Sequence, residues 1–320
     1  VMHLVNTYVH IIRELSTDSF SPVLEKAIGV GSAFEGWSPL KEDTVYRVLI
    51  PMKPPTGHAF HLEQSAANGT EARTCRIRMV LLRTIQERSL LCTLCTDSYL
   101  DVQKTTCWFQ ELVEDAWLVL SLTTMYRMEL LPSSRSYRVQ VRRHNKPMLT
   151  IEMILVVQLD NSDIFVSSES TEASSNSNTM WPETYAVAEV KFFRHITRKA
   201  PRDSCHLKCL QLCAHILDGS GFSVYTFKTV VMHLLTTIPL SNWHSKHFLD
   251  RLQDIMSYLR CCLEEKRLNH FFFGNENVPE EILLPSSFQN AVPPNLFHHL
   301  AQDPDSLPEA LRDFYELQNR

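Results

Sequence analysis

The hydrophobic periodicity of this chain changes near residue 180, and this change limits the folds that it can adopt. Before it, segments with the alternating or continuous apolar pattern of β-strands lie at residues 43–52, 58–63, 75–82, 136–143 and 148–159, with helical patterns at 2–15 and 98–120. After it, apolar residues repeat at helical spacing in residues 186–200, 204–221, 223–238 and 245–268. This order predicts an α+β protein in which a mixed sheet precedes a helical region.

The two regions are separated by a polar segment. Residues 148–159 read MLTIEMILVVQL, and such a nearly continuous apolar run predicts a central strand that is buried on both faces. Residues 161–180 then contain SSESTEASSNSNT, a low-complexity run that predicts a polar surface loop. We therefore predict a mixed α/β lobe over residues 1–180 and an all-helical lobe over residues 181–320.

Composition narrows the classes of function. The chain has 320 residues, of which 44% are hydrophobic, enough for a sizeable core. Its net charge of −5 makes nucleic acid an unexpected partner, because nucleic-acid-binding domains usually carry a basic excess. No apolar run reaches the roughly 18 residues of a membrane-spanning helix. Because a helical pattern is already under way at Val1, we expect an upstream part that could carry an anchor.

Several residues of the second region read as core rather than as ligand sites. Cys205, Cys209 and Cys213 recur every four residues, the spacing of one helix face, which predicts buried reduced thiols. The aromatic segments HFFFGN and NLFHHL, at residues 270–275 and 295–300, are expected to close the helical lobe.

Several separated segments resemble one known family. They are GVGSAFEGWSP from Gly29, YRVLIPMKPPTGHAFHLE from Tyr46, DNSDIFVSS from Asp160, CHLKCLQL from Cys205, YTFKTVVMHLL from Tyr225 and a long run from Asn242 to Asn275. They are similar to the inositol trisphosphate receptor-interacting protein-like family. That family lies within the male-abnormal-21-like group, which shares a nucleotidyltransferase fold with cyclic GMP-AMP synthase.

The resemblance implies a fold and a set of expectations. It implies a nucleotidyltransferase lobe followed by a helical lobe, with a cleft between them. It also implies a membrane-associated protein that binds a membrane receptor or a signalling protein. Fold alone does not imply activity, because one fold hosts many functions.

The resemblance also implies where catalytic metals would bind. Nucleotidyl transfer uses two divalent cations held by oxygen ligands. In this fold, two acids spaced as acid-x-acid lie on one strand and a third acid lies on a neighbouring strand. Here the acids of the first strand are Glu42 and Asp43, which are adjacent, and Glu152 takes the third position.

Adjacent acids make a poor metal site. Side chains alternate between the two faces of a strand, so Glu42 and Asp43 would point in opposite directions unless a β-bulge placed both on one side. Glu152 lies in an apolar run and therefore needs a partner. That partner could be a metal, or a cation such as Arg142 or Arg143. We expect these three acids to be vestigial metal ligands.

Gly31 and Ser32 mark a second candidate position. A Gly-Ser turn before a strand can offer donors to the phosphates of a nucleotide. It can equally be an ordinary turn from helix to strand. We expect a vestigial nucleotide site at most.

The sequence therefore predicts a nucleotidyltransferase-fold protein that has lost catalysis, requires no cofactor and acts by binding protein partners. The alternative is an active or ligand-sensing, Mg²⁺-dependent nucleotidyltransferase that uses Asp43, Glu152 and a third ligand.

Overall fold

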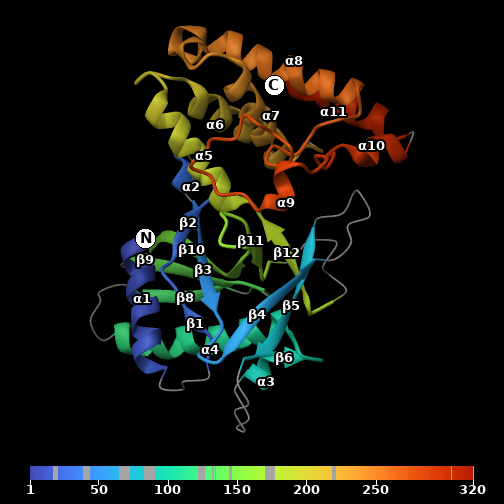
Figure 1. Ribbon diagram of the computed structural model, residues 1–320. Coiled ribbons are helices and arrows are strands. Elements are labelled where there is room, and N and C mark those ends of the chain that lie inside the picture. The colour runs from blue at the N-terminus through green and yellow to red at the C-terminus, as the bar shows by residue number, and fades with distance from the viewer. Residues whose placement is uncertain are drawn as a thin grey trace. The chain divides into compact units, whose positions relative to one another are not determined.

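The computed structural model describes residues 1–16, 21–38, 44–64, 73–82, 91–121, 127–131, 133, 135–143, 146–169, 177–217, 221–303 and 305–319. The described residues form two compact units. The first unit holds those of residues 1–34 and 44–188, and the second holds those of residues 35–38 and 189–319. The architecture is α+β, as predicted, with a large mixed sheet and a helical C-terminal region (Figure 1).

The first unit is built on a sheet of twelve strands within the described residues. The strands are β1 (Val23–Leu24), β2 (Ile28–Val30), β3 (Val45–Lys53), β4 (His58–Gln64), β5 (Thr74–Leu81), β6 (Cys95–Thr96), β7 (Tyr99–Leu100), β8 (Arg127–Leu131), β9 (Tyr137–Arg143), β10 (Lys146–Gln158), β11 (Phe165–Ser167) and β12 (Met180–Thr184). Its main path runs β1-β3-β10-β11-β12-β5-β7-β6. β2 pairs with β3, β4 with β5, and β9 with both β8 and β10.

β10 is the central strand that the apolar run predicts. It pairs in parallel with β3 and in antiparallel with β9 and β11. Its residues 150–157 are buried, as expected of a strand covered on both faces. The helices of this unit are α1 (Met2–Leu15), most of α2 (Ser32–Glu35), α3 (Leu91–Leu94) and α4 (Val102–Ser121). Tyr8 of α1 stacks on Trp117 of α4, with ring centroids 6.4 Å apart.

Two expectations for residues 161–184 are wrong. Residues 165–167 do not lie in a polar surface loop, because they form β11 and are buried. The helical region does not begin at residue 181, because β12 extends the sheet to Thr184. Both β11 and β12 carry apolar side chains that are buried, which explains why these segments belong to the sheet. In β12, Trp181 is fully buried and its indole nitrogen donates to the carbonyl oxygen of Leu100 at 3.0 Å.

The second unit is helical. Its elements are α5 (Ala186–Lys199, whose first turn belongs to the first unit), α6 (His206–Ile216), α7 (Val224–Thr237), the short 3₁₀ helices η2 (Leu240–Trp243) and η3 (Ser245–His247), α8 (Phe248–Glu264), α9 (Ser286–Gln289), α10 (His298–Gln302) and α11 (Ser306–Gln318). Cys205, Cys209 and Cys213 are buried free thiols, as the four-residue spacing predicts.

The aromatic segments of this unit lie in its core. Phe271, Phe272 and Phe273 are buried. The ring of Phe271 meets Phe192 of α5 at 4.9 Å between centroids, and the ring of Phe273 stacks on Phe288 of α9 at 4.0 Å. These contacts confirm that the HFFFGN segment closes the helical region.

A buried ionic cluster joins residues 35–38 to the helices of the same unit. Lys228 of α7 donates to Glu35 Oε1 at 2.6 Å and also to Glu189 Oε2 of α5. Glu35 Oε2 accepts a hydrogen bond from the indole nitrogen of Trp37 at 2.6 Å. All four side chains are buried. Burial raises the pKa of Glu35. The attraction of Lys228 offsets this rise only in part, because the same ammonium also faces Glu189, whose negative charge raises the pKa of Glu35 further.

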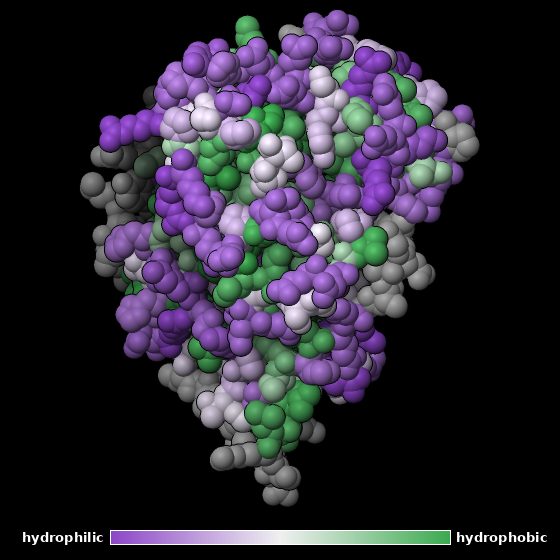
Figure 2. Space-filling view, turned by 45° about the horizontal axis from the view of Figure 1, so that its top comes forward, coloured by the Kyte–Doolittle hydropathy of each residue, from purple (hydrophilic) through white to green (hydrophobic). Residues whose placement is uncertain are grey.

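The surface in Figure 2 is mostly hydrophilic, and hydrophobic side chains gather in smaller patches. Among the described residues, none of the helices combines the length and the hydropathy that a membrane crossing requires.

Candidate functional site

The Gly-Ser segment lies between β2 and the first turn of α2. Gly31 has a φ angle of +79°, a left-handed conformation that favours glycine. Gly29 is also constrained, because a Cβ there would lie 2.5 Å from the ring of Phe34. Phe34 packs against Tyr46 of β3 at 5.9 Å between centroids. Local folding thus accounts for both glycines.

Glu152 lies at the centre of the sheet, between two arginines. In the register of the sheet, Glu152 of β10 is directly opposite Arg47 of β3 and Arg138 of β9. Side chains at directly opposed positions share one face of the sheet. The pairing of these three strands therefore places the two cations on either side of the acid. Val30 of β2 is opposite Arg47 in turn, so the Gly-Ser segment borders the same position.

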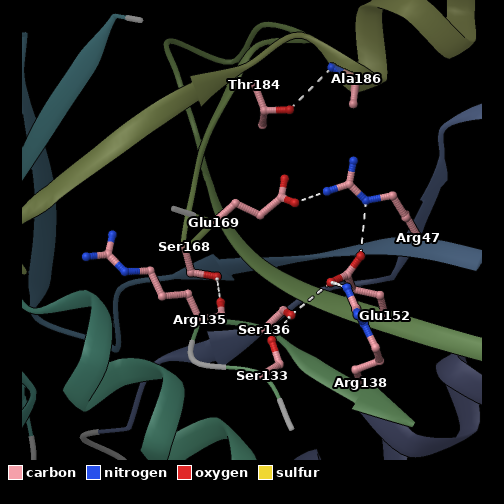
Figure 3. Close-up of polar contacts among 10 residues, drawn as sticks. All are labelled: Arg47, Ser133, Arg135, Ser136, Arg138, Glu152, Ser168, Glu169, Thr184 and Ala186. Carbon is pink, nitrogen blue, oxygen red and sulfur yellow. Dashed lines mark hydrogen bonds and ion pairs between the residues drawn. The ribbon is translucent and has the colours of Figure 1, made fainter. Parts of the chain in front are cut away.

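Both arginines bind the carboxylate of Glu152 (Figure 3). Arg138 Nη2 lies 2.7 Å from Glu152 Oε1, and Arg47 Nε lies 3.3 Å from Glu152 Oε2. Ser136 Oγ donates a third hydrogen bond to Oε1 at 3.0 Å. The acid is 7% exposed, and its two oxygens are held by Arg47 of β3, Arg138 of β9 and Ser136, which directly precedes β9.

These partners keep Glu152 ionised. Burial by itself would raise the pKa of its carboxyl group. The hydrogen bond from Arg138 and the positive charges of Arg47 and Arg138 outweigh burial, so the pKa of Glu152 lies below its ordinary value. The charge of this acid is therefore already balanced by protein cations.

A second acid extends the cluster. Arg47 Nη2 forms an ion pair with Glu169, which follows β11 and is partly exposed. The neighbouring Ser168 Oγ donates to the carbonyl oxygen of Arg135 at 2.9 Å. Figure 3 shows Arg47 between the two acids, with one side of its guanidinium toward each. Arg47 thus links β3, β10 and the segment after β11.

Of the three predicted metal ligands, the structure describes Glu152 alone. Glu42 and Asp43 lie outside the described part of the chain, so the prediction for these two acids stays untested. β3 itself, from Val45 to Lys53, contains no acid. No group of three or more His, Cys, Asp or Glu side chains within the described residues is arranged to hold a metal ion. Among the described residues, the side chains that bind the carboxylate of Glu152 are Arg47, Arg138 and Ser136.

The expectation that Glu152 pairs with a protein cation is confirmed, but Arg142 is not that cation. Arg142 instead pairs with Glu129 of β8 at 2.8 Å, and the side chain of Arg143 lies outside the described residues. The sequence shows arginine within both predicted strands, at Arg47 and Arg138. It does not show which strands are neighbours or in which register, and this information is needed to choose between the arginines.

We expect Glu152→Gln to lower the free energy of unfolding by about 1.5–3 kcal/mol, because charged hydrogen bonds to two arginines are lost. Denaturation in urea at neutral pH measures this loss. The loss should shrink as the pH falls from 4.5 toward the lower pKa of the folded state, because the native acid then also becomes neutral.

Glu129→Gln is the matched control. Glu129 is also a strand glutamate paired with an arginine, but its side chain is 53% exposed. Exposed pairs contribute about 1 kcal/mol or less. Equal losses in the two variants would contradict the assignment of a special role to Glu152.

Comparison with known proteins agrees with the resemblance in the sequence. Residues 205–286 match the model of the Mab-21 protein HhH/H2TH-like domain. The chain is 32% identical to inositol 1,4,5-trisphosphate receptor-interacting protein-like 1 of Rattus norvegicus, over 99% of this chain and 64% of that protein. The Mus musculus protein of the same name gives the same identity and coverage. Inositol 1,4,5-trisphosphate receptor-interacting protein of Homo sapiens is 27% identical, over 98% of this chain and 65% of that protein.

The chain spans a little less than two thirds of the length of each of these relatives. The Mab-21 match within the helical unit, together with the mixed sheet before it, agrees with the predicted nucleotidyltransferase fold. Over the length that it covers, the chain therefore belongs to the family of inositol 1,4,5-trisphosphate receptor-interacting proteins.

Proposed function

We propose that this chain is a catalytically inactive nucleotidyltransferase-fold module that acts by binding a protein partner. The observation that carries the proposal is the position of Arg47. It lies on the strand next to Glu152 and directly opposite it, on the same face of the sheet. A metal-dependent enzyme of this fold is expected to have an acid on that neighbouring strand.

An arginine at this position opposes metal binding for two physical reasons. It occupies an oxygen of Glu152 that a cation would need. It also adds a like charge, which costs about 4 kcal/mol per unit charge at 4 Å when the effective dielectric constant is about 20. Arg138 contributes in the same way on the other side of the acid.

The partner proposed is a membrane receptor or a signalling protein. The support for this comes from the names of the relatives: the Homo sapiens relative is named as a protein that interacts with the inositol 1,4,5-trisphosphate receptor, and the Rattus norvegicus relative is named as similar to such a protein. Membrane association of the longer protein is part of the same proposal. Surface plasmon resonance with the purified receptor tests the partner, and saturable binding by the folded chain is expected.

If the chain is catalytically inactive, nucleotides should not change its thermal stability. We expect ATP or GTP with Mg²⁺ or Mn²⁺ to leave the thermal midpoint unchanged. Differential scanning fluorimetry measures this, and its sensitivity is adequate because a ligand at a hundredfold excess over its Kd stabilises a protein by about 2.7 kcal/mol.

The alternative is a Mg²⁺-dependent nucleotidyltransferase that uses Asp43, Glu152 and a third ligand. It predicts a metal-dependent rise of the midpoint that disappears in both Asp43→Ala and Glu152→Ala and persists in Glu129→Ala. That pattern would overturn the proposal of an inactive module.

A further inference from the structure

A cavity of about 460 Å³ lies wholly within the helical unit. It is bounded by the start of α7, the end of α8, the segment that leads into α10, and α11. Its volume is within the range of about 300–1,000 Å³ that is usual for small-molecule sites. It has no residue in common with the cluster around Glu152.

Part of the cavity wall is apolar and is provided by Phe222, Leu263, Phe297 and Leu300, while the rest of the wall is polar. Leu263, Phe297 and Leu300 are also part of the buried core. A ligand that fills the cavity would therefore need an apolar body.

One side of the cavity is acidic. Glu309 and Asp313 lie one turn apart on α11 and both line the cavity. Asp313 is half-buried, and among the described residues it makes neither a hydrogen bond nor an ion pair. Its carboxylate reaches across to the segment before α7, since a Cβ at Gly221 would lie 2.3 Å from Asp313 Oδ2.

Positive charge in the cavity is scarce. Among its described lining residues there is no lysine or arginine, and His299 is the remaining titratable one. The start of α7 offers little to an anion, because Ser223 Oγ already accepts the hydrogen bond of Thr226 N at 3.1 Å. Beside the start of α11, the carboxylate of Asp303 adds a negative charge and accepts hydrogen bonds from Asp305 N at 3.1 Å and from Ser306 Oγ at 2.7 Å. The cavity therefore favours a positive ligand.

We propose that this cavity binds a small organic cation, a molecule with an apolar body and one amidinium, guanidinium or ammonium group. The apolar body contacts Phe222, Leu263 and Leu300. The cationic group donates charged hydrogen bonds to Asp313, whereas the charge of the neighbouring Glu309 is offset in part by its exposed ion pair with Arg312. This site does not depend on the proposed function, so either could be wrong without the other.

Three probes of nearly equal shape test the proposal: benzamidine, benzamide and benzoate. Ligand-observed NMR titrations of the whole chain give their dissociation constants. We expect benzamidine to bind at least about tenfold more tightly than benzamide, because a charged hydrogen bond contributes more than a neutral one, and benzoate to bind most weakly. Equal binding of the three probes would overturn the proposal.

Variants of α11 assign the binding to this cavity. Asp313→Asn should weaken benzamidine about tenfold, to the level of benzamide. Glu316→Gln is the control, since Glu316 is an exposed acid of the same helix that does not line the cavity. Ala310→Leu narrows the cavity and should weaken both benzamidine and benzamide, and it serves if Asp313→Asn does not fold. Unchanged benzamidine binding in either cavity variant would overturn the proposal.

Discussion

Lys228→Met should lower the free energy of unfolding by about 3–5 kcal/mol, because it leaves the buried carboxylates of Glu35 and Glu189 without their cation. Methionine keeps the length and apolar stem of the lysine, so the loss reports charge rather than volume. Chemical denaturation at neutral pH measures it.

The pH dependence of this loss is part of the prediction. Burial raises the pKa of Glu35, and removal of Lys228 takes away the attraction that offsets the rise. A group whose folded-state pKa is raised stabilises the protein at low pH and loses that contribution as the pH rises through the raised pKa. The cost of Lys228→Met should therefore grow with pH.

Lys208→Met is the control for this substitution. Lys208 lies on α6 of the same unit and is exposed. Its replacement should change the free energy of unfolding by less than about 0.5 kcal/mol. If Lys228→Met cost no more than Lys208→Met, the ionic cluster would not stabilise the helical unit.

His206 should make the protein less stable as the pH falls from 6.5 toward 4. This side chain is buried at the start of α6, where its nitrogens lie 3.2 Å from Thr197 Oγ1 and 2.8 Å from Ser204 Oγ. Burial lowers its pKa from 6.5 to about 4. The unfolded chain therefore takes up a proton in this range that the folded chain does not. The loss approaches about 3 kcal/mol, at roughly 1.4 kcal/mol per pKa unit.

Comparison with His206→Gln isolates this effect from that of the other titrating groups. The variant is expected to be less stable at neutral pH and to have a shallower decline between pH 6.5 and 4. His215→Gln, at an exposed position of the same helix, should follow the native curve. Parallel curves for native protein and His206→Gln would show that His206 is not held neutral by burial.

The sequence predicts the central parts of the fold well, because its signals there are local. The run from Met148 to Leu159 identifies the central strand without reference to any other segment. The four-residue spacing of Cys205, Cys209 and Cys213 identifies a buried helix face in the same way. β12 was missed because its few apolar residues follow directly after a polar low-complexity run.

The candidate site depends on long-range pairing, which a single sequence does not contain. Glu152 and Arg47 are 105 residues apart and meet only because β3 and β10 are parallel neighbours in one register. Lys228 and Glu35 are 193 residues apart. A lysine within an apolar helix stripe does signal a buried partner, and so does an acid within an apolar strand. Neither signal says which partner it is.

We propose that Arg47 and Arg138, which pair with Glu152, take the place of metal ions beside it. Crystals soaked with Mn²⁺ and a nucleoside triphosphate test it directly through the anomalous scattering of manganese. We expect that Glu152 binds no manganese and that Arg47 and Arg138 keep their contacts with Glu152. Two manganese ions seated between Glu152 and the acids Glu42 and Asp43, with Arg47 displaced, would contradict it.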